Sequence, residues 1–133
     1  STYSLVLIDL DNFKQINDRH GHLVGDRALR VVGDAIAASV RAGDVPVRYG
    51  GDEFLVVMPG GTLASAAEVA HRIRDAVAEA SLPFPLTLSA GVAAGDARDR
   101  REAVFERADQ ALYRAKALGR DRVVVDDTPR LHD

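Results

Sequence analysis

The sequence predicts an α+β domain in which an antiparallel central sheet is flanked by helices. Three observations support this class. Apolar runs of strand length alternate with longer stretches whose apolar side chains recur at helical spacing. Two of the runs flank a Gly-Gly pair, as the arms of a hairpin would. Hydrophobic residues make up 47% of the 133 positions, which suffices for one core and therefore for one domain.

The first half of the chain predicts three strands and two helices. Residues 4–9 (SLVLID) form a short apolar run that ends in an acid, as a buried central strand does. Residues 11–18 fit a short helix, and residues 23–40 carry an apolar stripe typical of an amphipathic helix. The runs 45–49 and 54–59 are the expected hairpin, with positive φ angles at the glycines between them.

The second half predicts two further helices and two further strands. Residues 66–77 show a helical stripe, and residues 86–92 (LTLSAGV) alternate as a strand does. A third stripe covers residues 104–118, and Gly119 follows it as a C-terminal cap. Residues 122–125 (RVVV) read as a last strand.

The elements follow the order β-α-α-β-β-α-β-α-β, which contains the split βαββαβ motif of ferredoxin-like sheets and an extra C-terminal strand. In that topology the first strand lies antiparallel to the second arm of the hairpin. The end of the first strand, Asp9-Leu10-Asp11, would then meet the start of the third, Asp52-Glu53. The fold would therefore bring four carboxylates to one edge of the sheet.

Composition excludes several classes of protein. A net charge of −3 and a pI near 5.8 argue against binding to a nucleic-acid polymer, which needs a basic face. The absence of cysteine excludes disulfides and thiolate metal sites, and fits the cytoplasm. No apolar run approaches ~18 residues, so this segment is not expected to contact a membrane, although an upstream region could anchor a longer protein. We expect the domain to cover residues 1–126 and residues 127–133 to form a polar tail, with fraying from Asp126 onward.

Converging carboxylates predict a site for a hard cation. Four acids close together repel one another unless a cation lies among them, and oxygen ligands select Mg²⁺ or Mn²⁺ over Zn²⁺. An EF-hand loop is the alternative for residues 9–20, but Phe13 and Lys14 stand where that loop needs an oxygen ligand and a glycine. For Asp11 a solvated strand end remains the other interpretation.

Two long motifs in the expected order then resemble a known family. DLDNFKQINDRHGHLVGD (residues 9–26), followed by RYGGDEF (residues 48–54), is similar to the GGDEF domain of diguanylate cyclases. The resemblance implies a palm like that of class III nucleotide cyclases, and the condensation of two GTP into cyclic di-GMP with release of two pyrophosphates. Members usually begin with a further helix before the first strand. This sequence starts almost on the strand, so we expect a domain that lacks that helix.

The resemblance implies a role for each site residue. The metal ligands would be Asp9, the backbone carbonyl of Leu10 and Asp52, binding a pair of Mg²⁺ or Mn²⁺ ions per GTP. Glu53 would act as general base on the ribose hydroxyl or hold its metal. Further GTP contacts would come from eight residues: Asn17, His22 and Asp26 on the nucleotide, Lys14, Lys116 and Arg120 on the phosphates, and Gly50 and Gly51 at the loop. Lys116 and Arg120, four positions apart, are expected to share a helix face.

The resemblance also implies partners and regulation. Because the product is a symmetric ring of two nucleotides, two domains must face each other in a homodimer, which can be transient. Arg41 and Asp44 form an R-x-x-D motif, and with Arg72 they would bind cyclic di-GMP at an inhibitory site. A catalytically weak domain that only binds GTP or cyclic di-GMP is the alternative function, and a generic class III nucleotide cyclase is the second.

Overall fold

The computed structural model describes residues 1–128 and confirms the predicted order of elements. The five strands are β1 (Thr2–Leu10), β2 (Val45–Arg48), β3 (Glu53–Pro59), β4 (Leu88–Asp96) and β5 (Arg122–Val125). The four helices are α1 (Phe13–His20), α2 (His22–Ser39), α3 (Leu63–Ala78) and α4 (Arg101–Ala117). No helix in this part of the chain is both long enough and apolar enough to cross a bilayer.

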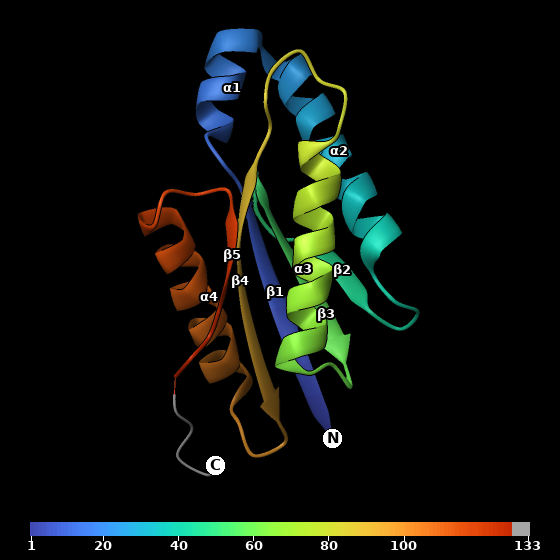
Figure 1. The fold of residues 1–133 in the computed structure, drawn as a ribbon, viewed down its shortest axis with the longest axis vertical. Helices are drawn as coiled ribbons and strands as arrows, with labels where there is room; N and C mark the ends of the chain where they lie inside the picture. The colour runs from blue at the N-terminus through green and yellow to red at the C-terminus, as the bar shows by residue number, and fades with distance from the viewer. Residues whose placement is uncertain (129–133) are drawn as a thin grey trace.

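The strands form one sheet in the order β2-β3-β1-β4-β5, with β1 at its centre (Figure 1). β1 is antiparallel to β3 and to β4, as the split βαββαβ motif requires. β5, the extra strand, adds to β4 in parallel, which makes the complete sheet mixed. The predicted fold class is therefore confirmed, and the end of β1 meets the start of β3 as expected.

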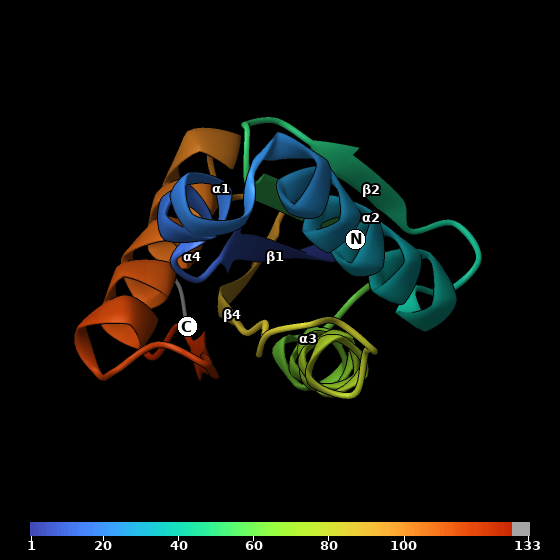
Figure 2. The same cartoon turned by 90° about the horizontal axis from the view of Figure 1, so that it is seen from above.

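Helices cover both faces of the sheet, because the strands alternate their side chains between two apolar layers. Val6 and Ile8 of β1 belong to the larger cluster, to which α2 and α3 contribute. Leu5 and Leu7 belong to the smaller cluster, under α4. Figure 2 shows α3 and α4 apart from each other with β4 between them. Contact between α4 and β4 is close at Gly91, where an added Cβ would lie 2.2 Å from the carbonyl oxygen of Ala108.

Two sequence predictions were wrong in this framework. The left-handed glycines are Gly21, Gly43, Gly60 and Gly119, so the hairpin glycines at 50 and 51 do not supply positive φ angles. Nor does the chain fray from Asp126, which is only 8% exposed. Its amide donates to the carbonyl of Val92 at 2.7 Å, and its carboxylate accepts from Arg107 at 3.0 Å. Residues 129–133 of the expected tail lie outside the described residues.

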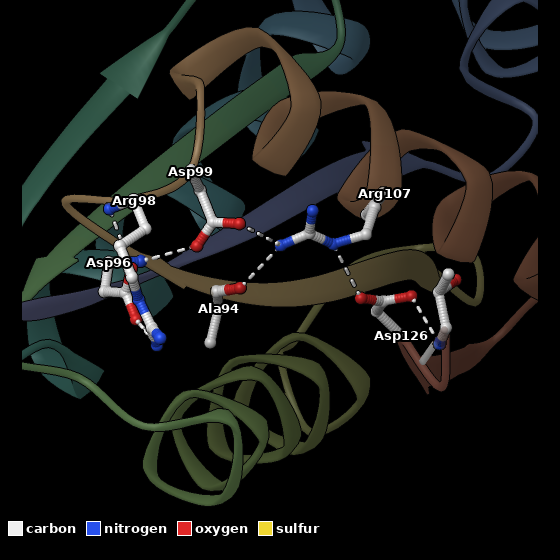
Figure 3. A network of polar contacts seen from close by, with 7 residues as sticks. Ala94, Asp96, Arg98, Asp99, Arg107 and Asp126 are labelled. Carbon is white, nitrogen blue, oxygen red and sulfur yellow. Dashed lines mark hydrogen bonds and ion pairs between the residues drawn. The ribbon is translucent and has the colours of Figure 1, made fainter. Parts of the chain in front are cut away.

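Arg107 is the centre of the buried polar network that holds Asp126 (Figure 3). Its guanidinium donates to the carbonyl oxygen of Ala94 at 2.8 Å and lies 3.9 Å from the carboxylate of Asp99. The network thus ties the end of β5 and the loop after β4 to the first half of α4. It lies away from the end of the sheet at which the acidic residues gather.

Candidate active site

The candidate active site lies where β1 ends and β3 begins, at the end of the sheet nearest α1 (Figure 1). Asp9 stands opposite Glu53 in the antiparallel register, and the Leu10 amide donates to the Asp52 carbonyl at 3.1 Å. A cavity of about 200 Å³ opens here. Its lining includes six of the residues expected to bind metal or phosphate: Asp9, Leu10, Lys14, Asp52, Lys116 and Arg120.

Asp9 is the most electrostatically perturbed carboxylate in the cavity. One oxygen, Oδ2, accepts a hydrogen bond from the Lys116 ammonium, whereas the buried Oδ1 has no hydrogen-bond partner among the described residues. Burial raises the pKa of Asp9 above its ordinary value of 3.8, and the neighbouring Asp52 raises it further, while Lys116 opposes both effects. A half-satisfied buried carboxylate at the edge of a cavity is suited to a cation.

The donors around the cavity fit a hard cation such as Mg²⁺. Asp9, Asp52 and the backbone of Leu10 supply oxygen only, and Mg²⁺ commonly takes one or two carboxylates and shares its remaining positions with water and substrate phosphates. Within residues 1–128 no three acidic or histidine side chains are gathered so as to hold a metal on their own. A metal at this cavity would therefore need further ligands from water or from a bound nucleotide.

Three of the four predicted acids, Asp9, Asp11 and Asp52, line the cavity, whereas Glu53 pairs with Asp9 in the register but lies outside the lining. Asp11 differs from the other two because its carboxylate is already bonded within the protein. Its side chain is 5% exposed, which also rules out a solvated strand end. Oδ1 accepts from the Ser89 hydroxyl at 2.7 Å, and Oδ2 accepts from the Thr87 hydroxyl at 2.7 Å and from the Asp121 amide at 2.9 Å. Three donors from two other segments of the chain thus bind this carboxylate, so it is not free to act as a metal ligand.

The side chain of Glu53 lies close to Gly50 in the loop before β3. A Cβ at Gly50 would lie 2.4 Å from Oε1 of Glu53, so a larger residue there would displace the end of the Glu53 side chain, although Gly50 has no positive φ angle. Arg48 braces the loop by donating to the carbonyls of Gly50 at 3.2 Å and Gly51 at 2.7 Å. Burial raises the pKa of the Tyr49 phenol, and the Glu53 carboxylate raises it further.

The expected phosphate ligands come from three separate elements. Lys14 lies in the first turn of α1, and Lys116 in the last turn of α4. Arg120 lies beyond the end of α4 in a left-handed conformation with φ 66°, so the expectation that it shares a helix face with Lys116 was wrong. A Schellman motif brings it to the cavity instead: the Arg120 amide donates to Ala115 at 2.9 Å and the Gly119 amide to Lys116 at 3.2 Å.

The expected guanine contacts lie outside that cavity, on α1 and α2. Asn17 packs so closely on α2 that a Cβ at Gly25 would fall 1.8 Å from its Oδ1, an atom that is buried without a hydrogen-bond partner. His22 is the first residue of α2, and Asp26 lies one turn further along it; both are exposed. The Asn17 amide therefore lies against the helix that carries His22 and Asp26.

The residues of the expected inhibitory site gather at the far end of α2. Arg41 and Asp44 bind each other: the Arg41 amide donates to Asp44 at 2.8 Å, and its guanidinium does so twice at 3.3 Å. Arg72 of α3 donates to the Ser39 carbonyl at 3.0 Å, close to this pair. Arg72 thus contacts the backbone two residues before Arg41, and Asp44 also performs the local turn-closing role that the sequence allowed.

Comparison with known protein families identifies the family of this chain. Residues 1–122 match the family model described as "Diguanylate cyclase, GGDEF domain". The chain belongs to the GGDEF domain family. The match takes in β1 to α4 and the first residue of β5, so it includes each residue of the cavity.

Named GGDEF relatives resemble the chain over nearly its whole length. It is 43% identical to the diguanylate cyclase DgcP of Pseudomonas aeruginosa over 91% of the chain, and 46% identical to the response regulator PleD of Caulobacter vibrioides over 91%. It spans only 19% and 28% of those two relatives. Among solved structures, the active GGEEF domain of a diguanylate cyclase from Vibrio cholerae superposes with a TM-score of 0.91 at 33% identity, over 97% of this chain and 85% of that one.

Sequence reasoning missed the contacts by which several residues hold this GGDEF site together. Arg48 and Asp11 act on backbone or hydroxyl groups whose positions only the folded chain defines. Thr87 and Ser89 did carry a signal, because two hydroxyls alternate with apolar residues in LTLSA and face a common side. Arg74 of α3, which contacts Asp121, carried none.

Proposed function

We propose that this GGDEF domain is a diguanylate cyclase that condenses two GTP into cyclic di-GMP and releases two pyrophosphates. One observation carries the proposal: a single cavity is lined both by Asp9 and Asp52, which suit a metal, and by Lys14, Lys116 and Arg120, which suit phosphates. A diguanylate cyclase needs both groups around one triphosphate.

The residues have separate tasks in this reaction. Asp9, Asp52 and the Leu10 carbonyl would hold Mg²⁺ or Mn²⁺, in a pair per GTP, and the bound metal would supply activation of the attacking 3′-hydroxyl and neutralisation of the leaving pyrophosphate. Glu53 would accept the hydroxyl proton or add a ligand. Gly50 and Gly51 would let phosphates approach the backbone closely, since neither residue carries a side chain of its own.

Asn17, Asp26 and His22 would select guanine. A carboxylate can accept from the adjacent N1–H and N2–H donors of guanine, whereas adenine leaves such an acceptor unsatisfied at roughly 1–3 kcal/mol. The Asn17 side chain lies against α2, the helix that carries His22 and Asp26, which supports contact of all three with one base. ATP should therefore bind at least about ten-fold more weakly than GTP in calorimetry. Equal affinities would contradict the guanine assignment.

Each domain holds one GTP, so catalysis needs two domains facing each other about a two-fold axis. A transient dimer that forms during turnover is sufficient. The expected signature is a rate per domain that rises with protein concentration. A rate per domain independent of concentration over a wide range, in a protein that stays monomeric, would contradict this requirement.

Arg41, Asp44 and Arg72 would bind the product and inhibit the enzyme. The solved GGDEF domain of DgcB from Caulobacter crescentus, with a TM-score of 0.89 to this chain, is described in complex with c-di-GMP. An arginine fork can donate to a phosphate or to guanine, and Asp44 can accept from guanine after exchanging its present bonds with Arg41. Arg41→Ala should weaken inhibition by added cyclic di-GMP, and Arg98→Ala, an exposed arginine paired with Asp96, is the matched control.

The alternative is a catalytically weak domain that serves as a module for binding GTP or cyclic di-GMP. Incubation with GTP and Mg²⁺ followed by mass analysis separates the two functions. A product with the mass of cyclic di-GMP, lost in Glu53→Gln, supports the enzyme. Binding of GTP without any product, at protein concentrations that permit dimers, supports the module.

A further inference from the structure

The turn after α4 has an unusual backbone that something must hold in place. Three successive residues have positive φ angles: 120° at Gly119, 66° at Arg120 and 49° at Asp121. Only glycine adopts such angles without strain, and each of the other two costs on the order of 1 kcal/mol. Two successive non-glycine residues keep this left-handed conformation only where contacts with the surrounding structure hold it in place.

Two side chains grip the backbone of Asp121 from different elements. On one side, Oδ2 of Asp11, the residue that follows β1, accepts from the Asp121 amide at 2.9 Å. On the other side, the guanidinium of Arg74 on α3 donates to the Asp121 carbonyl at 3.0 Å and to its side chain at 3.1 Å. The turn is therefore fixed relative to both the central strand and a helix of the opposite layer.

The grip determines where Arg120 lies. Arg120 follows the end of α4, where its amide is bonded to Ala115 of the helix, and it lines the cavity together with Asp9 and Asp52. Its neighbour Asp121 is the held residue. A shift in the Asp121 backbone would move Arg120 with it, because the two share a peptide plane.

We propose that Asp11 and Arg74 are positioning residues for triphosphate binding, which they support by fixing the 119–121 turn so that Arg120 faces the cavity. The proposal rests on the proposed function, since it assumes that the cavity receives GTP. It assigns Asp11, which lies beside the expected metal ligands, to the phosphate side of the site, and it gives a role to Arg74, which lies outside the cavity lining.

The test compares two nucleotides that differ in their phosphates. Calorimetry with Mg²⁺ would measure binding of α,β-methylene-GTP, which cannot release pyrophosphate, and of GMP. Asp11→Ala and Arg74→Ala should each weaken binding of the analogue by about tenfold, as expected for loss of one charge-assisted contact, and leave GMP binding within about twofold. In combination with Arg120→Ala, neither should weaken analogue binding further, because both act through that residue.

A conservative variant separates positioning from metal binding. Asp11→Asn keeps one oxygen for the Asp121 amide, and its amino group can donate to Ser89, so analogue binding and the Mg²⁺ dependence of turnover should stay near those of the parent. If Asp11→Asn shifts the Mg²⁺ dependence as strongly as Asp11→Ala does, Asp11 is a metal ligand and the proposal is wrong. The proposal is also wrong if Asp11→Ala or Arg74→Ala weakens analogue binding further in combination with Arg120→Ala. It is wrong, too, if either variant weakens GMP binding as much as analogue binding.

Two controls keep the result interpretable. Thermal unfolding of each variant establishes that it folds, and if Asp11→Ala does not, the partly exposed Arg74 decides the proposal. Arg98→Ala removes a surface arginine from another carboxylate pair and should bind both nucleotides as the parent does. A parent that binds neither nucleotide would overturn the proposed function itself. A parent that binds the analogue, with an Arg74→Ala variant that binds it equally well, would overturn the positioning proposal alone.

Discussion

Asp9 and Lys116, which lie 107 residues apart in the chain, form an ion pair at the cavity. The pair joins the central strand β1 to the last turn of α4, and it uses one of the two carboxylate oxygens. A residue expected to bind phosphate thus contacts a residue expected to bind metal. Binding of a metal–nucleotide complex would give each of them a new partner at the same time.

Asp9→Asn should reduce turnover by more than about 100-fold, because several kcal/mol of charge stabilisation at the metal would be lost. The measurement is the rate of cyclic di-GMP formation at saturating GTP and Mg²⁺. Retention of the parent rate in a folded Asp9→Asn variant would contradict the site assignment.

The same substitution should not reduce stability at neutral pH. The folded-state pKa of Asp9 is raised above the ordinary value of 3.8, so the folded protein binds this proton more tightly than the unfolded chain does. The parent therefore loses stability relative to Asp9→Asn as pH rises from about 4 through that raised pKa. Urea unfolding at several pH values in EDTA checks the sign, and a parent that gains stability over the variant across this range would contradict it.

Gly25→Ala should weaken GTP binding by about tenfold while the domain still folds. The new methyl group would displace the end of the Asn17 side chain, which can rotate away, and so cost a hydrogen bond to the nucleotide worth roughly 1–2 kcal/mol. Gly33→Ala is a matched control on the same helix, because nothing lies within 4 Å of its added Cβ. It should leave GTP binding unchanged and raise stability by up to about 1 kcal/mol. Equal GTP affinity in both variants would show that Asn17 does not contact the substrate.

Gly91→Ala should destabilise the domain by about 3 kcal/mol, because the added methyl group meets backbone that cannot rotate aside. It would lie 2.2 Å from the Ala108 carbonyl and 2.3 Å from the Leu112 amide, both on α4. The helix must then move off β4. Denaturant unfolding measures the change, with Gly33→Ala again as the control, and a loss below about 0.5 kcal/mol would show that α4 shifts freely.

Arg107→Ala should cost about 3–5 kcal/mol, since it leaves the buried carboxylates near it without their cation (Figure 3). Arg98→Ala breaks a shorter and more exposed pair with Asp96 and should cost less than about 1 kcal/mol. The comparison of the two free energies of unfolding isolates the effect of burial. A similar loss of unfolding free energy in both variants would mean that water reaches the Arg107 network.

The fold was predictable because apolar residues recur at different spacings in its strands and its helices. The order of these elements then matched the split βαββαβ motif, which fixes how the strands pair. RVVV was predicted at the residues where β5 lies, and the meeting of Asp9 with Glu53 followed from topology alone. The start of β4 was misplaced, because Leu86 and Thr87 continue the alternating pattern before the strand begins at Leu88. A local pattern does not reveal where hydrogen bonding to a neighbour starts.

Within the site, the residues of the cavity were predictable and their detailed contacts were not. Asp11 looked like its neighbour Asp9, and only the hydroxyls of Thr87 and Ser89 distinguish the two acids. Asp126 looked like part of a polar tail, yet a buried arginine 19 positions earlier holds it. In each case the deciding partner is distant in sequence, and composition near the residue contains no trace of it.

The central position of β1 has a consequence for how the domain is made. β1 is synthesised before its partners β3 and β4, and Thr2 pairs with Asp96, which lies 94 positions later in the sequence. Until then a strongly apolar strand has both hydrogen-bonding edges open, which is the condition in which nascent chains associate wrongly. Folding of this sheet must wait for distant segments, so slow folding of the domain is expected, and chaperone contact during synthesis should include the residues of β1.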